Sequence, residues 1–167
     1  MAVTAAGSGG GGVFRITVDG AQEFEASIQR FASEIDDYRE AWDEIGAYMA
    51  EVVERRFSSE GPGWAPLSPA YAAWKQANYG GASILVRTGA LRGSMAVQDV
   101  SSKAMEFGTS NPYATYHQHG TSRMPMRRII ELDANDTRNI HRIFARFIAQ
   151  KARQAGLYPG QAGGATT

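Results

Sequence analysis

The sequence contains no cysteine and no excess of either charge. Without thiols the chain forms neither disulfides nor thiolate nucleophiles, which fits a reducing compartment. Lys plus Arg and Asp plus Glu both number 17, so the formal net charge is zero, whereas a chain that mainly binds nucleic acid tends to be basic. The sequence also lacks an apolar run of the roughly 20 residues that span a membrane, and its N-terminus lacks the pattern of a signal peptide. We therefore expect a protein without a membrane partner, made in the cytoplasm or in a particle assembled there.

Complete catalytic motifs are missing as well. Gly80-Gly81 and Arg87-Thr88-Gly89 lack the spacing of a phosphate-binding loop, and no Gly-x-Ser-x-Gly elbow occurs. His117 and His119 are two residues apart, so they point to different faces of a helix, and no third ligand with suitable spacing follows. His141 stands alone on a basic segment. The sequence therefore predicts a protein that is not an enzyme and binds neither a catalytic metal nor a cofactor.

The composition is that of an ordinary globular protein, with 43% hydrophobic and 20% charged residues. We predict a single domain over residues 13–156. Residues 1–12 form a Gly-rich arm and residues 157–167 a Gly/Ala/Thr tail, and neither has the apolar periodicity needed to fold alone. Both termini are therefore expected to be flexible in the free protein, and the arm to lie along a neighbouring subunit after assembly.

The N-terminal half of the domain is predicted to hold a strand and a long helix. Alternation over residues 13–19 predicts the strand. Apolar residues spaced 4-3-4-3 over residues 22–57 predict one helix about 50 Å long. Its seam either crosses the domain's own sheet or packs partly against another subunit. The seam consists of Phe24, Ile28, Phe31, Ile35, Tyr38, Trp42, Ile45, Met49 and Val52.

Local signals place the remaining elements. Ser68-Pro69 begins a short helix, because Ser is a favoured N-cap and Pro suits the first helical position. Residues 95–100 and 104–108 predict a hairpin, residues 126–132 a final strand, and residues 133–154 a second long helix. The expected fold class is therefore α+β: an antiparallel sheet of about four strands, flanked by a long N-terminal helix and a long C-terminal helix.

The basic residues concentrate near the C-terminal helix. Asn135 or Asp136 is expected to cap this helix, whose arginines recur over Arg138–Arg153 after the pair Arg127-Arg128. They form a solvated face, a subunit contact or a lining for passing DNA. Two alternative functions therefore stay open: a coiled-coil adaptor that uses the Phe24–Val52 seam, and a DNA-binding protein that uses the basic helix.

Three motifs follow one another in the middle of the chain. They read Gly63-Trp64-Ala65-Pro66-Leu67-Ser68-Pro69, then Leu85-Val86-Arg87-Thr88-Gly89-Ala90-Leu91-Arg92-Gly93-Ser94, then Gly108 with Tyr113-Ala114-Thr115-Tyr116-His117-Gln118-His119-Gly120. In this order and spacing they resemble the phage virion morphogenesis (tail completion) family. The residues that carry the resemblance are Trp64, Pro66, Leu67, Arg87, Thr88, Gly89, Leu91, Ser94, Tyr113, His117 and Gly120.

These motif residues also have a physical interpretation of their own. Trp64 brings enough apolar area to hold its loop on the core. Arg87 offers a planar fork to carbonyl or carboxylate oxygens, and Thr88 is a suitable cap for a turn. Tyr113 and His117 are four residues apart and share a helix face. All these roles are structural.

The resemblance implies a structural virion protein of a tailed phage. Such a protein completes the head-proximal end of the tail or joins the tail to the neck, as part of a ring around the DNA channel. The implied partners are further copies of the chain, in a ring expected to be a homohexamer, and the adjoining tail terminator, connector and tail tube proteins. The resemblance also allows transient contact with DNA in the channel.

Overall fold

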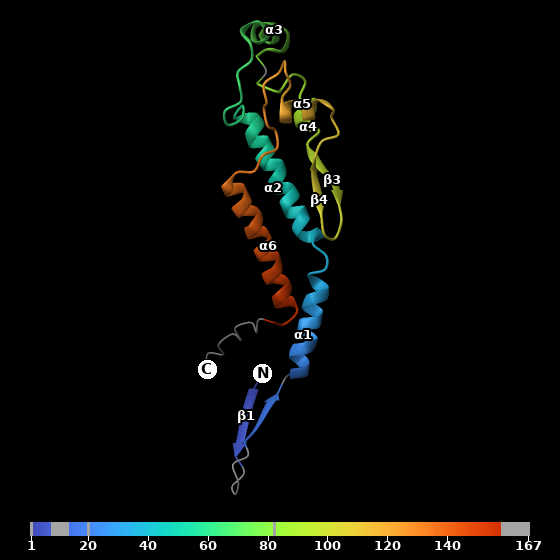
Figure 1. The fold of residues 1–167 in the computed structure, drawn as a ribbon. Helices are drawn as coiled ribbons and strands as arrows, with labels where there is room; N and C mark the ends of the chain where they lie inside the picture. The colour runs from blue at the N-terminus through green and yellow to red at the C-terminus, as the bar shows by residue number, and fades with distance from the viewer. Residues whose placement is uncertain (1, 8–13, 20, 82, 158–167) are drawn as a thin grey trace, which may run out of the picture. The chain divides into compact units, whose positions relative to one another are not determined.

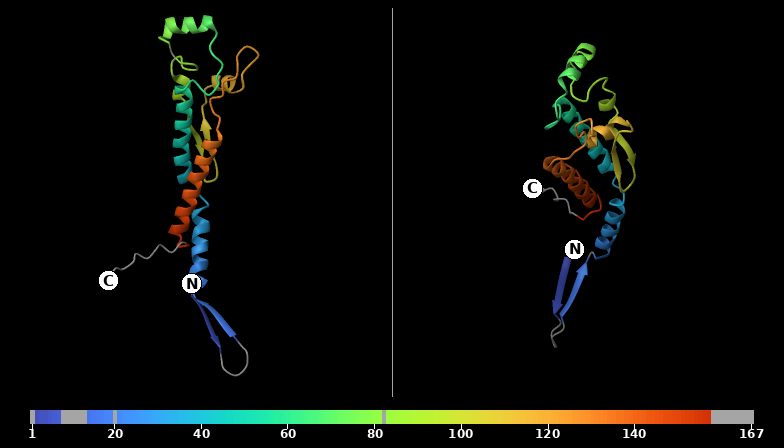
Figure 2. Two further views of the ribbon diagram at one scale, coloured as in Figure 1. Left: turned by 90° about the vertical axis from the view of Figure 1, so that its left-hand side faces the viewer. Right: turned by 45° about the horizontal axis from the view of Figure 1, so that its top comes forward.

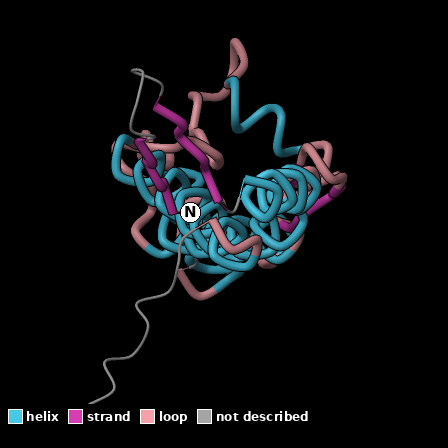
Figure 3. The backbone as a smooth tube through the Cα atoms, turned by 90° about the horizontal axis from the view of Figure 1, so that it is seen from below, coloured by secondary structure: helices cyan, strands magenta, loops and turns pink. Residues whose placement is uncertain are grey.

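The computed structural model describes residues 2–7, 14–19, 21–81 and 83–157. Helices make up most of the described chain, as the cyan segments of Figure 3 show. The predicted α+β class is confirmed. In chain order the elements are β1 (Ala2–Gly7), β2 (Phe14–Asp19), α1 (Ala21–Glu34), α2 (Arg39–Ser58), α3 (Pro69–Tyr79), α4 (Ala90–Gly93), β3 (Ala96–Val100), β4 (Met105–Gly108), α5 (Tyr113–His119) and α6 (Ala134–Gln154) (Figure 1).

The chain divides into two compact units. The larger unit is Tyr38–Phe144, and the smaller combines the described parts of residues 1–37 and 145–157. Helix α6 contributes its first half to the larger unit and its second half to the smaller one. The predicted domain limits at residues 13 and 156 stay predictions, because residues 8–13 and 158–167 lie outside the described part of the chain.

The strands form two separate antiparallel pairs rather than one sheet of about four strands. Strand β1 pairs with β2, with Ala2 opposite Asp19 and Gly7 opposite Phe14. Strand β3 pairs with β4, with an irregularity between Val97 and Asp99. Strand β1 lies in the segment that the sequence assigned to the N-terminal arm, and pairing with β2 gives its backbone the partners that an isolated Gly/Ala segment lacks.

The strand predicted over residues 126–132 does not form. A side chain takes the place of a neighbouring strand: Gln118 Oε1 accepts hydrogen bonds from the amides of Ile129 (2.9 Å) and Ile130 (3.1 Å). The Gln118 amide nitrogen in turn donates to the carbonyl of Ile130 at 2.6 Å. Because these buried backbone groups already have partners, no strand is needed to satisfy them.

The single long helix predicted over residues 22–57 is wrong, because the chain breaks between α1 and α2. In a continuous helix the Tyr38 amide would donate four residues back, but it donates instead to the carbonyl of Ser102 at 2.8 Å. The Tyr38 ring meets Trp42 and Phe144 edge-on, both at 6.1 Å between centroids, and Lys103 lies 4.8 Å from its centre. These contacts within the larger unit hold Tyr38 in a non-helical position.

Helix α6 forms where the sequence predicted it, but a different residue caps it. Asp133 Oδ1 accepts the amides of Asn135 and Asp136, both at 2.7 Å. Asp136 Oδ2 returns the interaction by accepting the Asp133 amide at 3.2 Å. This is a reciprocal capping box built from two aspartates. Asp136 is buried and also accepts from the Tyr48 hydroxyl (2.7 Å) and from Arg55 (3.1 Å).

The core of the larger unit surrounds α2. This helix lies beside the β3–β4 hairpin and contacts both of its strands (Figure 1, Figure 2). Two side-chain clusters bury its apolar face. One cluster centres on Ile45, Met49 and Ile143 of α6. The other centres on Val53, Phe57 and Ile129, beneath the motif-bearing loops. The second half of the predicted seam is therefore buried within the chain itself.

The smaller unit holds the start of the seam and the end of α6. Within it, Arg30 donates to the carbonyl of Ala155 (3.2 Å) and to Ser27 Oγ (2.8 Å). The buried Phe147 comes from α6. Phe24 and Ile28 of α1 remain 47% and 43% exposed. These two apolar side chains have surface left for a contact with another molecule.

Gly46 lets α2 approach the hairpin closely. A Cβ at this position would lie 2.7 Å from Val97 Cγ2, and the stiff, β-branched Val97 moves aside only at a cost. We expect Gly46→Ala to lower the free energy of unfolding by about 1–3 kcal/mol through overpacking, although alanine favours helices. Urea unfolding followed by circular dichroism measures this change. The double variant Gly46→Ala/Val97→Ala should recover part of the loss, and a stabilised single variant would show that the approach is not tight.

Candidate functional site

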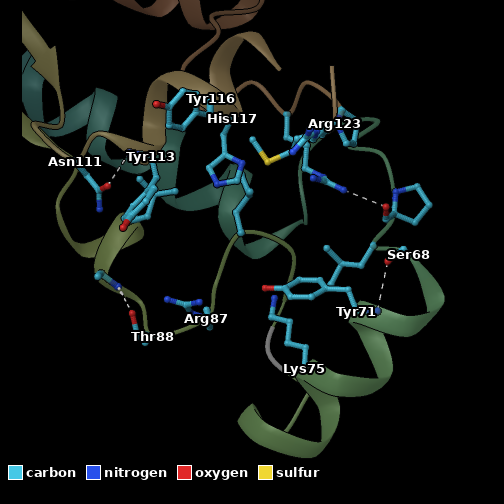
Figure 4. A pocket seen from close by; sticks show the side chains of 18 of the residues that line it. Ser68, Tyr71, Lys75, Arg87, Thr88, Asn111, Tyr113, Tyr116, His117 and Arg123 are labelled. Carbon is cyan, nitrogen blue, oxygen red and sulfur yellow. Dashed lines mark hydrogen bonds between the residues drawn. The ribbon is translucent and has the colours of Figure 1, made fainter. Parts of the chain in front are cut away.

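A groove of about 950 Å³ opens in the larger unit. Its walls come from α3, from α5, from the segment that leads into α4, and from the loop that joins α5 to residue 127. Figure 4 shows Tyr71 and Lys75 on the α3 side, His117 pointing into the space between, and Arg87 below. The lining thus brings together segments that are far apart in the sequence.

The α3 wall starts where the sequence predicted. Ser68 Oγ accepts the Tyr71 amide at 3.4 Å, Pro69 occupies the first turn, and Gly80 ends the helix in the left-handed region. Lys75 is buried, and its ammonium donates to the carbonyl of Ser83. Burial lowers the pKa of Lys75, an effect that the nearby Glu60 charge partly offsets. Lys75 therefore holds the 83–88 segment against α3.

A second buried cation, Arg127, holds the base of the groove. Its Nε donates to the carbonyl of Ala65 at 2.8 Å and its guanidinium NH2 to that of Pro66 at 3.0 Å. Its backbone amide donates to the carbonyl of His117 at 2.8 Å. Burial lowers the pKa of Arg127. One residue therefore fastens the Trp64 motif to the end of α5.

The α5 wall carries two exposed tyrosines and a half-buried histidine. Asn111 Oδ1 accepts the Tyr113 amide at 3.1 Å and so fixes the start of the helix. Tyr113 and Tyr116 are 64% and 54% exposed. The Nδ1 atom of His117 is buried without a hydrogen-bond partner among the described residues. Burial, and to a smaller degree the charge of Arg127, lower the pKa of His117.

The Arg-Thr-Gly motif forms the lower rim. Thr88 Oγ1 accepts the Ala90 amide at 3.4 Å, but the residue at the N-cap position of α4 is Gly89, in the left-handed region, and not the predicted Thr88. Leu91 packs against the Phe57 cluster. Ser94 ends this segment, with its hydroxyl donating to the Leu91 carbonyl at 2.9 Å.

Two motif residues stabilise the groove from outside its lining. Trp64 is half-buried, meets Phe57 edge-on at 6.0 Å, and donates from its indole nitrogen to the Arg128 carbonyl at 3.0 Å. Gly120 ends α5, and a Cβ there would lie 2.9 Å from the Met126 amide nitrogen. Both residues hold backbone segments in close contact.

The structure thus places most of the motif residues around one groove. Those that line it are Pro66, Leu67, Arg87, Thr88, Gly89, Leu91, Tyr113 and His117. Sequence reasoning did not select Tyr71, Tyr116 and Arg123, which also line it. Tyr71 and Tyr116 could have been found as large aromatic residues on short, polar helices, whereas Arg123 lies in a loop that gives no periodic signal.

Among the residues that the structure describes, no carboxylate lines the groove. Lys75 and Arg127 donate to backbone carbonyls, but the exposed guanidinium groups of Arg87 and Arg123 make no hydrogen bond or ion pair with any described residue. The described residues also contain no group of three His, Asp or Glu side chains that could hold a metal ion. The side chains of the groove are therefore suited to binding an acceptor-rich partner.

The chain matches a known protein family. A family model described as the phage virion morphogenesis family matches residues 19–149, a range that contains the whole groove. No curated protein and no solved structure matches the chain. Across the described ranges, none of the helices has the length and apolarity required to cross a membrane.

Trp64 should contribute to stability through both its ring and its indole N–H. Because the ring is only half-buried, we expect Trp64→Ala to lower the free energy of unfolding by about 3 kcal/mol. Trp64→Phe keeps an aromatic contact with Phe57 and loses the bond to Arg128, so it should cost about 1 kcal/mol. Chemical denaturation of both variants measures the difference. Equal losses would show that the ring contact contributes little.

His117 should make the fold less stable in weak acid. Since its pKa is lower in the folded state, the unfolded chain takes up a proton first as the pH falls below about 6.5. Stability should therefore decrease from that pH down to the folded pKa and then stop changing through this group. Thermal unfolding of His117→Gln at pH 7 and pH 5 should show a smaller difference than the parent. The matched control is His119→Gln, and an equal reduction in that variant would contradict the assignment.

Proposed function

Because the chain belongs to the phage virion morphogenesis family, and so has a structural or assembly role in a phage virion, we propose that it completes the head-proximal end of the tail or joins the tail to the neck. The groove in the larger unit is the observation that supports a binding role best. Its described lining residues combine aromatic rings and arginines and include no carboxylate. Surfaces of this composition are typical of the cores of protein–protein interfaces.

The proposal includes a ring of identical subunits, a homohexamer around the DNA channel. A closed ring uses two different patches on each subunit, because its contacts run head to tail. Besides the groove, the described residues offer the exposed Phe24 and Ile28 of α1 as apolar surface. Exposed apolar side chains that lie together on an element favour contact with another subunit.

The coiled-coil alternative loses support from the fold. The predicted seam is interrupted between Glu34 and Arg39, and Ile45, Met49 and Val52 are buried within the chain. A dimerising coiled coil needs several uninterrupted heptads with an exposed seam. The first helix alone supplies two heptads, so a virion ring is the stronger proposal.

The proposed function is tested in the phage that encodes the chain. Inactivating the gene should leave heads and tails assembled but unjoined in electron micrographs, and supplying the chain from a plasmid should restore joined particles. Sedimentation velocity of the purified chain, alone and with tails, measures ring formation. Normal, infectious particles without the chain would refute the proposal. Salt-dependent binding to duplex DNA by a monomer would favour the DNA-binding alternative.

Deletion of Ala2–Gly12 tests the predicted role of the N-terminal arm. The larger unit, Tyr38–Phe144, contains neither β1 nor β2, so its thermal unfolding should be nearly unchanged. Attachment to the particle should weaken, because the deletion removes β1 and with it the β1–β2 hairpin, which we propose contacts a neighbouring subunit. Differential scanning calorimetry and particle yield measure the two effects. Full yield of infectious particles from the deletion variant would show that the arm is a passive tail.

A further inference from the structure

We propose that the groove between α3 and α5 holds a short peptide segment of a neighbouring virion protein, and that this segment presents a carboxylate beside an apolar side chain. The inference rests on the proposed assembly role and adds the chemistry of the partner. It follows from the charges, the walls and the rigidity of the groove.

The charges select a carboxylate. Arg87 and Arg123 line the groove with exposed guanidinium groups that have no hydrogen-bond or ion-pair partner among the described residues. The described residues of the lining include no Asp or Glu to neutralise them. A guanidinium donates two parallel hydrogen bonds to a carboxylate, so an acidic side chain or a chain terminus satisfies either arginine.

The aromatic and aliphatic walls of the groove favour a partner with an apolar side chain next to that carboxylate. Tyr71 is 40% exposed, and Tyr113 and Tyr116 of α5 face the same groove with larger exposed fractions. Leu67 and Leu91 add aliphatic surface to the lining. Burying aromatic and aliphatic surface is the main source of affinity in such sites, whereas a free inorganic anion would leave these walls in water.

The frame of the groove is fixed before a partner arrives. Arg127 holds the 65–66 backbone, Lys75 bonds to the Ser83 carbonyl after α3, and Thr88 Oγ1 accepts the Ala90 amide. Binding to such a preformed site orders few protein groups, so the entropic cost falls mainly on the partner. A short extended peptide, which has few groups to order on binding, therefore suits the groove better than a partner protein whose surface must rearrange first.

Nucleic acid fits the groove less well. Binding to duplex DNA depends on several cations that follow the phosphate backbone, and here two of the cations in the lining already bond to carbonyls. The groove is also concave and holds about 950 Å³, within the range of pockets that enclose small ligands (roughly 300–1,000 Å³) rather than a duplex. A peptide segment uses both the guanidinium groups and the aromatic walls.

The test selects peptides without assuming the partner's identity. A displayed library of random linear peptides is panned against the immobilised full chain. We expect enrichment of peptides that carry Asp or Glu next to Leu, Phe, Tyr or Trp. The most enriched peptide is then synthesised with a fluorophore, and fluorescence anisotropy gives its Kd for the parent chain and for its variants.

The decisive variant is Arg87→Glu/Arg123→Glu, which reverses both unpaired charges. It should weaken peptide binding by roughly tenfold or more, since like charges then face each other. Arg138→Glu on the exposed part of α6 changes charge outside the groove and should leave the Kd within about twofold of the parent. Matching circular dichroism melts of the three proteins show that each is folded.

Several results would overturn the inference. One is enrichment of basic or uncharged peptides, and another is an acidic peptide that binds Arg87→Glu/Arg123→Glu and Arg138→Glu with the same Kd. A third is binding of a single-stranded or duplex oligonucleotide that the double variant loses. The fourth is self-association that the double variant loses. The last result would assign the groove to a second copy of the chain. Peptide binding is measured apart from particle assembly, so failure here leaves the joining of heads and tails to be decided by the gene-inactivation experiment.

Discussion

The groove depends on one buried guanidinium. Arg127 donates to the carbonyls of Ala65 and Pro66, and its own amide donates to the carbonyl of His117. A buried arginine without acceptors would carry a large desolvation penalty, so these carbonyls must stay in place for the cation to be tolerated. Burial lowers the pKa of His117, and the charge of Arg127 adds to this effect to a smaller degree. Packing, hydrogen bonding and electrostatics of the two walls are thus coupled through this side chain.

Elements with strong local signals could be predicted from the sequence. Ser68 and Pro69 begin α3 as expected, and the alternating residues of β3 and β4 form the predicted hairpin. The apolar stripe of α6 likewise predicted a helix at 133–154, and the structure has one at Ala134–Gln154. In each case the residues that define the element are neighbours in sequence, so propensity and periodicity are sufficient.

The elements that the sequence missed are decided by distant groups. The break before α2 follows from the bond between the Tyr38 amide and Ser102, and the missing strand at 126–132 follows from the Gln118 side chain. The periodicity of apolar residues does not reveal such contacts, because it reflects only residues that are close in sequence. The candidate site shows the same limit: the motifs pointed to Arg87 and His117, but only the fold reveals that Arg123 lies in the same groove.

The Gln118 amide also has a consequence for sequence divergence in this region. It fixes Ile129 and Ile130 by direct bonds, so the position of Ile129 in the core does not depend on the length of the loop between Gly120 and Pro125. A loop whose far end is anchored independently tolerates insertion and substitution. Relatives could therefore exchange this loop, and the arginine that it carries, while the rest of the domain stays constant.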